Sequence, residues 1–158
     1  PSSNTPIKRA DMHYTTHGFR HHRLEPNDDH GMVLTGHTIE SNHYNIQITQ
    51  PRLTWVQHQH VHWDIHADHA THRQNTQNIQ LKGHINIYKK PDTKQPAIVL
   101  TTDQLNVDSL PHYAYTSPPV QIIQNKTQTQ ANGVEIDFDH DRIVLHHGAK
   151  TTIEGLLS

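Results

Sequence analysis

Apolar and polar side chains alternate along much of this chain, and the segment 61–90 shows the pattern most clearly. Its apolar positions are Val61, Trp63, Ile65 and Ala67, followed by Ile79, Leu81, Ile85 and Ile87. Because successive side chains of a strand point to opposite faces, this period of two predicts half-buried β-strands. Residues 73–78 between them are turn formers without an apolar side chain. The segment therefore predicts a strand, a short turn and a second strand.

The same unit recurs along the chain. Residues 65–70 have counterparts at 34–39, at 100–105 and, more loosely, at 129–134. The anchor residues Leu53, Ile85 and Val120 lie 32 and 35 positions apart, a spacing typical of stacked supersecondary units. Each unit also carries a residue that lets a strand bend, at Pro51, Gly83 or Pro118. We therefore expect a stack of similar bent strand pairs.

The remaining segments favour a chain that is nearly all β. We expect a first strand around Met12, Tyr14, Phe19 and Leu24, a turn at 25–31, loops at 91–96 and 110–113, and a tight turn at 139–141. Residues 132–133, Asn-Gly, fit either a hairpin turn or a bulge inside a strand. No segment shows a sustained helical period with a cap.

Composition narrows the range of folds and partners. Hydrophobic residues make up 32 % and charged residues 18 % of the 158 residues, so any core is thin and suits two sheets with a groove between them. The formal net charge is −2 and Lys and Arg form no stripe, so we do not expect nucleic acid as a partner. The chain has no cysteine, and no apolar run reaches the roughly 18 residues that a membrane helix needs.

Histidine is conspicuous, with 18 residues in the chain. His58, His60 and His62 have a spacing at which alternate imidazoles on one strand could meet a zinc ion. However, the histidines are spread over the whole chain, and these three have the parity of the outer face. We therefore interpret histidine as a polar surface residue and expect no metal site and no cofactor.

No pattern predicts an enzyme. Residues 137–141, Asp-Phe-Asp-His-Asp, resemble the start of a calcium loop, but Arg142 and Gly148 stand where that loop needs Gly and Glu. A hairpin turn is the better interpretation. Other carboxylates, such as Asp64 and Asp103, have outward parity or lie in turns, so no paired acid and base is indicated.

The inward-facing apolar residues leave two interpretations open. They form either an ordinary sandwich core or the wall of an apolar groove that receives a lipid, if the two sheets do not close fully. The groove residues would be Phe19, Ile46, Ile48, Leu53, Trp55, Trp63, Ile65, Leu81, Ile85, Ile87, Leu105, Val107, Val120, Ile122, Ile136 and Phe138.

Five motifs together resemble the periplasmic domain of the LptC family of lipopolysaccharide export proteins. They are Thr-Gln-Pro-Arg-Leu-Thr at 49–54, Val-His-Trp-Asp-Ile-His-Ala-Asp-His-Ala at 61–70, Gly-His-Ile-Asn-Ile at 83–87, Thr-Thr-Asp-Gln-Leu-Asn-Val at 101–107 and Ala-Asn-Gly-Val-Glu at 131–135. The likeness runs from about Met12 to Glu154. The histidine-rich outer face departs from the family pattern.

The resemblance implies a twisted, open β-jellyroll over residues 12–158, preceded by a flexible lead-in at 1–11. It implies that lipopolysaccharide arrives from an inner-membrane ABC transporter of LptB, LptF and LptG at the N-terminal edge and passes to LptA at the C-terminal edge. The resemblance also implies a single-pass inner-membrane anchor and a domain on the periplasmic side of a Gram-negative bacterium. Because the chain starts at Pro1 and not Met, we expect that this anchor has been removed.

Exposed strand edges invite another chain to add a strand. We expect the docking edge for LptA to comprise Ile143, Val144, Leu145, Thr151 and Ile153, and the transporter edge to lie near Phe19 or Leu34. Three alternatives remain: an LptA-like bridge component, a histidine-rich periplasmic metal-binding protein, and a carbohydrate-binding jellyroll. The last would need exposed aromatic residues at outward positions, whereas Trp55 and Trp63 have inward parity.

Overall fold

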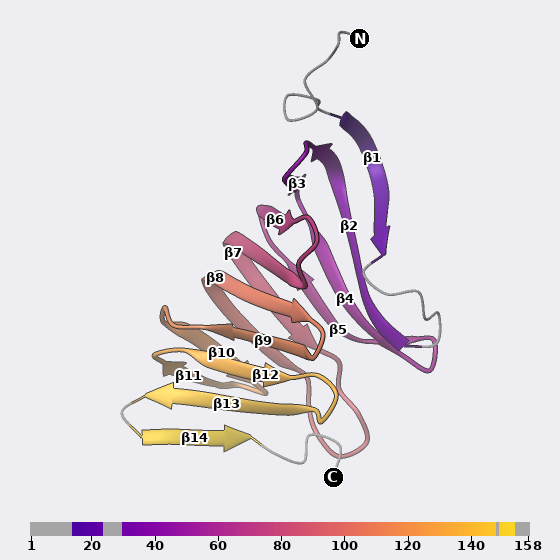
Figure 1. The fold of residues 1–158 in the computed structure, drawn as a ribbon. Helices are drawn as coiled ribbons and strands as arrows, with labels where there is room; N and C mark the ends of the chain where they lie inside the picture. The colour runs from indigo at the N-terminus through magenta and orange to yellow at the C-terminus, as the bar shows by residue number, and fades with distance from the viewer. Residues whose placement is uncertain (1–13, 24–29, 148, 154–158) are drawn as a thin grey trace, which may run out of the picture.

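Every regular element in the described part of the chain is a β-strand. The structure, a computed structural model, describes residues 14–23, 30–147 and 149–153, with side-chain detail for 31–146. The strands stack from β1 at one end to β14 at the other (Figure 1). No helix in these ranges is long and apolar enough to cross a membrane. The predicted turn at 25–31 and the lead-in at 1–11 fall wholly or largely outside the described residues.

Of the fourteen strands in the described residues, β1, β2, β7 and β8 are long and the others are short. Their bounds are β1 Tyr14–Arg23, β2 His30–Ser41, β3 Asn45–Thr49, β4 Arg52–Gln57, β5 His60–His66, β6 His69–Arg73, β7 Asn78–Lys89, β8 Ile98–Ser109, β9 His112–Thr116, β10 Val120–Gln124, β11 Thr127–Ala131, β12 Val134–Asp137, β13 Arg142–His147 and β14 Ala149–Ile153. All of their pairings are antiparallel, and they join into one sheet.

This sheet folds over on itself because its long strands bend and take part in both layers. The first half of β2 pairs with β4, and its second half pairs with β3. The first half of β7 pairs with β6, and its second half pairs with β5. We call the layer of β4, β5, β10 and β11 the first sheet and the layer of β3, β6, β9, β12, β13 and β14 the second sheet.

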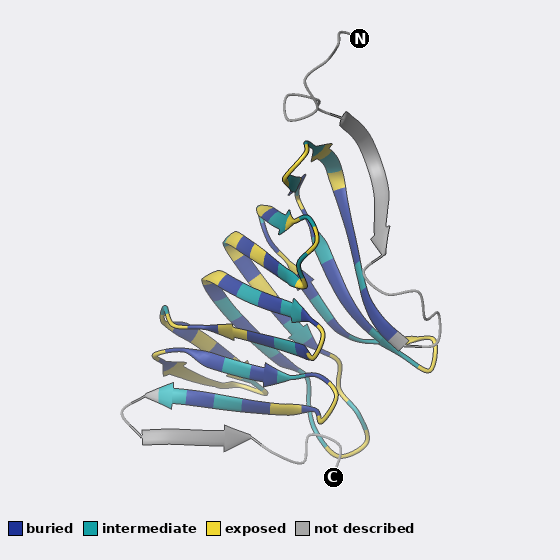
Figure 2. Ribbon diagram, in the orientation of Figure 1, coloured by how far each residue is buried: buried dark blue, intermediate teal, exposed yellow. Residues whose placement is uncertain are grey.

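Apolar side chains line up in ladders across each sheet. In the first sheet, directly opposed residues are Leu34, Leu53, Ile65, Ile87, Leu100 and Ile122. In the second sheet the corresponding residues are Ile39, Ile48, Ala70, Leu81 and Leu105. All except the half-buried Ile39 are buried in one core cluster between the sheets, and Figure 2 shows buried positions alternating with exposed ones along the strands.

Backbone hydrogen bonds hold the bends together side by side. Gln50 donates its N–H to the Asp68 carbonyl at 2.8 Å, and Ala67 donates to the Pro51 carbonyl at 3.3 Å. Asp68 in turn donates its N–H to the Gly83 carbonyl at 2.9 Å. The two sheets are thus joined through the backbone along one side of the molecule, which we call the bend side.

The bend at Gly83 requires a residue without a side chain. Its φ of +84° is a conformation that residues with a side chain rarely adopt, and an added Cβ would lie 2.5 Å from Asp68 Oδ2. We expect Gly83→Ala to lower the free energy of unfolding by about 2 kcal/mol or more. Urea unfolding of this variant against Lys82→Ala, its exposed neighbour, measures the effect. Equal stability of the two variants would contradict this account of the bend.

The predicted repeat is confirmed, with two corrections to its details. The anchors Leu53, Ile85 and Val120 each stand at or near the start of a first-sheet segment, after a bend. Segment 61–90 contains three strands and not two, because the chain bends at residues 67–68 and begins β6 in the other sheet. The Asn-Gly pair at 132–133 is a bend and not a hairpin turn, since β11 pairs with β10 and β12 pairs with β9 and β13.

Three of the turns contain an Asn or Asp residue in the left-handed backbone conformation. Asn75, Asn125 and Asp141 have φ values of 65°, 56° and 52° in the turns that precede β7, β11 and β13. Asn and Asp adopt this conformation more readily than other residues with a side chain. The predicted turn at 139–141 is confirmed as the connection between β12 and β13, with Asp137 paired to Arg142. The loop at 91–96 is also confirmed, between β7 and β8.

Candidate functional site

The predicted groove residues lie together between the two sheets. Fourteen of the sixteen are buried: Ile48, Leu53, Trp55, Trp63, Ile65, Leu81, Ile85, Ile87, Leu105, Val107, Val120, Ile122, Ile136 and Phe138. Ile46 is partly buried and packs against this cluster, and the Phe19 side chain lies outside the described ones. In this structure the side chains of these groove residues fill the space between the sheets, so the predicted groove is closed.

On the side away from the bends, the sheets meet through side chains. Phe138, in the turn between β12 and β13, lies edge-on to Trp63 at a ring distance of 5.3 Å and 6.1 Å from Trp55. Trp55 is also 4.5 Å from the ring of His112. The two tryptophans belong to the first sheet, whereas Phe138 and His112 belong to the second. We call this contact region, residues 55, 63, 89, 112 and 138–141, the seam.

Ionisable groups flank the aromatic rings of the seam. His112 is only 7 % exposed, and its Nδ1 lies 2.9 Å from both carboxylate oxygens of Asp139. Trp63 donates its indole N–H to Asp141 Oδ1 at 3.4 Å, a long hydrogen bond. The first contact joins the turn at 138–141 to β9 of its own sheet, and the second joins it to the first sheet.

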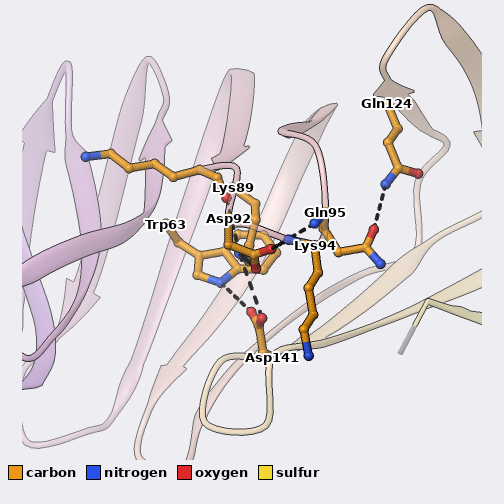
Figure 3. Close-up of polar contacts among 8 residues, drawn as sticks. Trp63, Lys89, Asp92, Lys94, Gln95, Gln124 and Asp141 are labelled. Carbon is orange, nitrogen blue, oxygen red and sulfur yellow. Dashed lines mark hydrogen bonds and ion pairs between the residues drawn. The ribbon is translucent and has the colours of Figure 1, made fainter. Parts of the chain in front are cut away.

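Lys89, the last residue of β7, is buried next to this turn with 3 % exposure. Its Nζ lies 3.8 Å from Asp141 Oδ2 and 3.8 Å from Asp92 Oδ2, and it donates to the Lys90 carbonyl at 3.2 Å (Figure 3). Burial raises the pKa of Asp141, although the nearby ammonium of Lys89 acts in the opposite direction. The sequence interpretation missed this cluster because it assigned aspartates to outward positions and turns.

A second titratable contact lies on the bend side. His84 Nδ1 is 2.6 Å from Asp68 Oδ2, and this hydrogen bond raises the pKa of the exposed His84 side chain. A raised pKa in the folded state stabilises the protein while histidine is protonated, and this stabilisation is lost as the pH rises through that pKa.

We therefore expect His84→Gln to cost stability at about pH 6 and to cost little at about pH 9, above the raised pKa of His84. Urea unfolding at both pH values, with the exposed His37→Gln as a matched control, measures the difference. A cost of His84→Gln that does not change with pH would contradict the role of the imidazolium.

The histidines that suggested zinc do not share one face of a strand. His58 lies in the turn between β4 and β5 with a φ of 52°, and His60 and His62 lie on β5. Within the described ranges, no three His, Cys, Asp or Glu residues are grouped so that they could hold a metal ion.

The outer face of the second sheet carries polar and aromatic residues. Tyr113 and Tyr115 on β9 lie 6.1 Å apart, and Tyr113 donates its hydroxyl hydrogen bond to Glu135. His146 Nε2 lies 2.6 Å from the other Glu135 oxygen. Burial, followed by the Glu135 carboxylate, raises the pKa of Tyr113, so its hydroxyl stays protonated. These tyrosines are the outward aromatic residues that the sequence interpretation did not single out.

The strand pairings place the free edges of the stack. Among the described strands, β1 pairs only with β2, whereas at the other end β14 pairs only with β13 in the second sheet and β11 pairs only with β10 in the first sheet. Ile143, Val144 and Leu145 lie on β13, which is paired on both sides, and Ile143 and Leu145 are buried. Thr151 and Ile153 therefore mark the C-terminal edge. Leu34 likewise lies on a strand paired on both sides, which leaves β1, with Phe19, at the other edge.

Two comparisons with known proteins found similarities. A family model described as lipopolysaccharide-assembly, LptC-related, matches residues 2–154. Among solved structures, the chain is similar to LptH, the LptA homologous periplasmic component of the lipopolysaccharide transport device of Pseudomonas aeruginosa. That similarity has 8 % identity and a TM-score of 0.46 and covers 92 % of this chain and 96 % of LptH. No match was found among curated proteins.

A family match over nearly the whole length of this bent, antiparallel β-jellyroll with an apolar interior defines the class of the protein: it is a lipopolysaccharide-transport protein. Within that class, the chain belongs to the LptC-related family of lipopolysaccharide-assembly proteins.

Proposed function

We propose that this domain binds the acyl chains of lipopolysaccharide between its two sheets and passes the lipid along the stack. The observation that carries the proposal is the continuous apolar interior, in which the ladders of opposed side chains run across successive strands of both sheets. The wall is aliphatic and aromatic, so it offers acyl chains contact without a fixed polar partner. The domain needs no catalytic step of its own for this task.

The solvation of the lipid explains why a covered path is needed. Burying a methylene group is worth about 0.8 kcal/mol, so a lipid with several acyl chains meets a large free-energy barrier in water. An apolar interior that extends from one edge of the stack to the other replaces water throughout the transfer.

Entry of acyl chains requires the packed interior to open. On the bend side the sheets share continuous strands and backbone hydrogen bonds, such as that from Asp68 N–H to the Gly83 carbonyl. On the opposite side, the described contacts across the seam are ring packing, one long hydrogen bond and one ion pair. Because side-chain contacts can be exchanged for lipid contacts without breaking a strand pairing, the sheets would part at the seam.

Photocrosslinking at two neighbouring positions of β3 tests the binding site. Ile46 packs against the interior, whereas Gln47 is exposed on the other face of the same strand. With a photoreactive amino acid at each position, we expect lipopolysaccharide to attach at position 46 at least several-fold more than at position 47. The opposite ratio would show that lipid lies on the outer face. Comparable unfolding curves establish that both variants are folded.

We further propose that the two ends of the stack join neighbouring components of the bridge. β14 is the edge at which LptA would add a strand, and β1 is the edge for the ABC transporter of LptB, LptF and LptG. Because β14 lies in the second sheet, pairing there would extend that sheet into LptA and bring the two apolar interiors into line. Acyl chains could then cross the junction without contact with water.

A further inference from the structure

We propose that Lys89 binds an anionic group of the lipid, such as a phosphate, and that Asp141 occupies that group's place while the interior is closed. This inference rests on the proposed binding of lipid between the sheets. It assigns a headgroup site at the seam, where neither the apolar pattern nor the family match assigns one.

The first argument is the burial of Lys89 without good hydrogen-bond partners. A lysine ammonium has three donors, and the described hydrogen bond of Lys89 is the one to the Lys90 carbonyl. Both neighbouring carboxylate oxygens lie 3.8 Å away, too far for a hydrogen bond. Lysine is almost never buried in this way unless it is paired, so the position has a reason other than packing.

The carboxylates around Lys89 are also poorly satisfied. Asp92 Oδ2 and Asp141 Oδ2 are buried and accept no hydrogen bond from the described residues. Such orphaned oxygens cost free energy in a folded protein. Asp92 is held in its loop by N–H groups of Lys94 and Gln95, each at 2.8 Å from Oδ1, whereas Asp141 belongs to the turn at the seam. Asp141 is therefore the member of the cluster that can leave.

The position of the cluster specifies the ligand. Lys89 is paired with Trp63 across the first sheet, and Phe138 and Asp141 of the same turn cover these two residues. When the turn moves away, it uncovers an apolar ring and a cation at once. A molecule with acyl chains beside an anionic group fits that combination, since the chains would enter between the sheets and the anion would stay at the rim.

The exchange of one anion for another follows from the charges. Without Asp141, Lys89 would keep only the Asp92 carboxylate at 3.8 Å, too far for a hydrogen bond, so a ligand that only pushed the turn aside would leave a buried charge poorly paired and would bind weakly. A phosphate offers several oxygens at hydrogen-bond distance, and hydrogen bonds between two charged groups are stronger than neutral ones. The phosphate would thus replace the long contact to Asp141 with short ones.

The test compares two lipids on four chains. Bisphosphorylated lipid A and its dephosphorylated form are titrated against the wild-type chain, Lys89→Met, Asp141→Asn and the control Lys82→Met, an exposed lysine on the outer face of β7. We expect the wild-type chain to prefer the phosphorylated lipid about tenfold, as one charged hydrogen-bond contact can provide. Lys89→Met should lose this preference and keep the wild-type affinity for the dephosphorylated lipid. Asp141→Asn should bind the phosphorylated lipid more tightly than the wild-type chain does. Lys82→Met should bind both lipids as the wild-type chain does.

A second readout uses the wild-type chain, in case Lys89→Met does not fold. In protein labelled with ¹³Cε-lysine, the Lys89 signal, assigned from the spectrum of Lys89→Arg, should shift with phosphorylated lipid A and stay in place with the dephosphorylated form. An unchanged signal, or a tenfold preference that survives in Lys89→Met, overturns the inference and leaves binding between the sheets intact. Failure of the wild-type chain to bind either lipid would instead refute the proposed function, and the headgroup site with it.

Discussion

Phe138→Ala is expected to lower the free energy of unfolding by about 3 to 5 kcal/mol, as is usual for removal of a buried phenylalanine ring. The ring is 2 % exposed and contacts Trp55 and Trp63 across the seam. The same change should increase the rate at which lipopolysaccharide enters, because it removes the ring that holds the sheets together on the side away from the bends.

A matched core variant separates these two effects. Ile136→Ala, two residues away on β12, also removes a fully buried side chain and should cost about 2 to 5 kcal/mol. Ile136 lies in the second sheet opposite Ala114 and Ile143 and is not part of the seam. Urea unfolding gives the stabilities, and stopped-flow mixing with labelled lipopolysaccharide gives the entry rates. Equal acceleration in both variants would mean that general loosening, and not the seam, admits the lipid.

Loss of LptA binding on blocking the β14 edge is the second large effect that we expect. Proline removes a backbone N–H and is not accommodated inside a paired strand. Adjacent residues of an edge strand point their N–H groups alternately toward the inner neighbour and toward the free edge. Of Thr151→Pro and Thr152→Pro, one should therefore block an added strand while the other disturbs the pairing of β14 with β13.

The docking measurement needs two controls, which are a folded domain and a contact with a second partner that does not involve β14. Deleting β13 as well would remove the buried Ile143 and Leu145, so point changes in β14 are the cleaner experiment. We expect at least one proline variant to lose copurification with LptA, with circular dichroism unchanged and the transporter contact at β1 preserved. Capture of LptA at wild-type affinity by both folded variants would exclude β14 as the bridge.

The fold could be predicted because it repeats. A period of two within strands, and a Pro or Gly at several bends, are local signals, and the ladder through Leu53, Ile65 and Ile87 reproduces the alternation in space. The break at residues 67–68 escaped prediction because Ala67 continues the apolar alternation of β5 up to the bend. There the sequence has no Pro or Gly, and the bend is imposed by the neighbouring strands through backbone hydrogen bonds.

The apolar part of the candidate site could also be predicted, whereas the seam could not. Trp63 and Asp141 are 78 residues apart, and nothing local marks Asp141 as different from Asp139 in the same turn. Lys89 has inward parity on β7, but a lysine at the end of a strand normally reaches solvent. Trp63 and Lys89 are neighbours in the first sheet, and only the folding of the second sheet over the first brings Asp141 to them.

The ladders of opposed side chains give the interior a regular step. Neighbouring strands lie about 4.8 Å apart, so a chain lying across Leu34, Leu53 and Ile65 meets nearly the same surface after moving by one strand. The positions that an acyl chain could occupy along the stack are then close in free energy and separated by low barriers. If lipid binds there as proposed, it would diffuse in both directions on such a surface, and a steady supply of new lipid at β1 would be enough to make the net movement run toward β14.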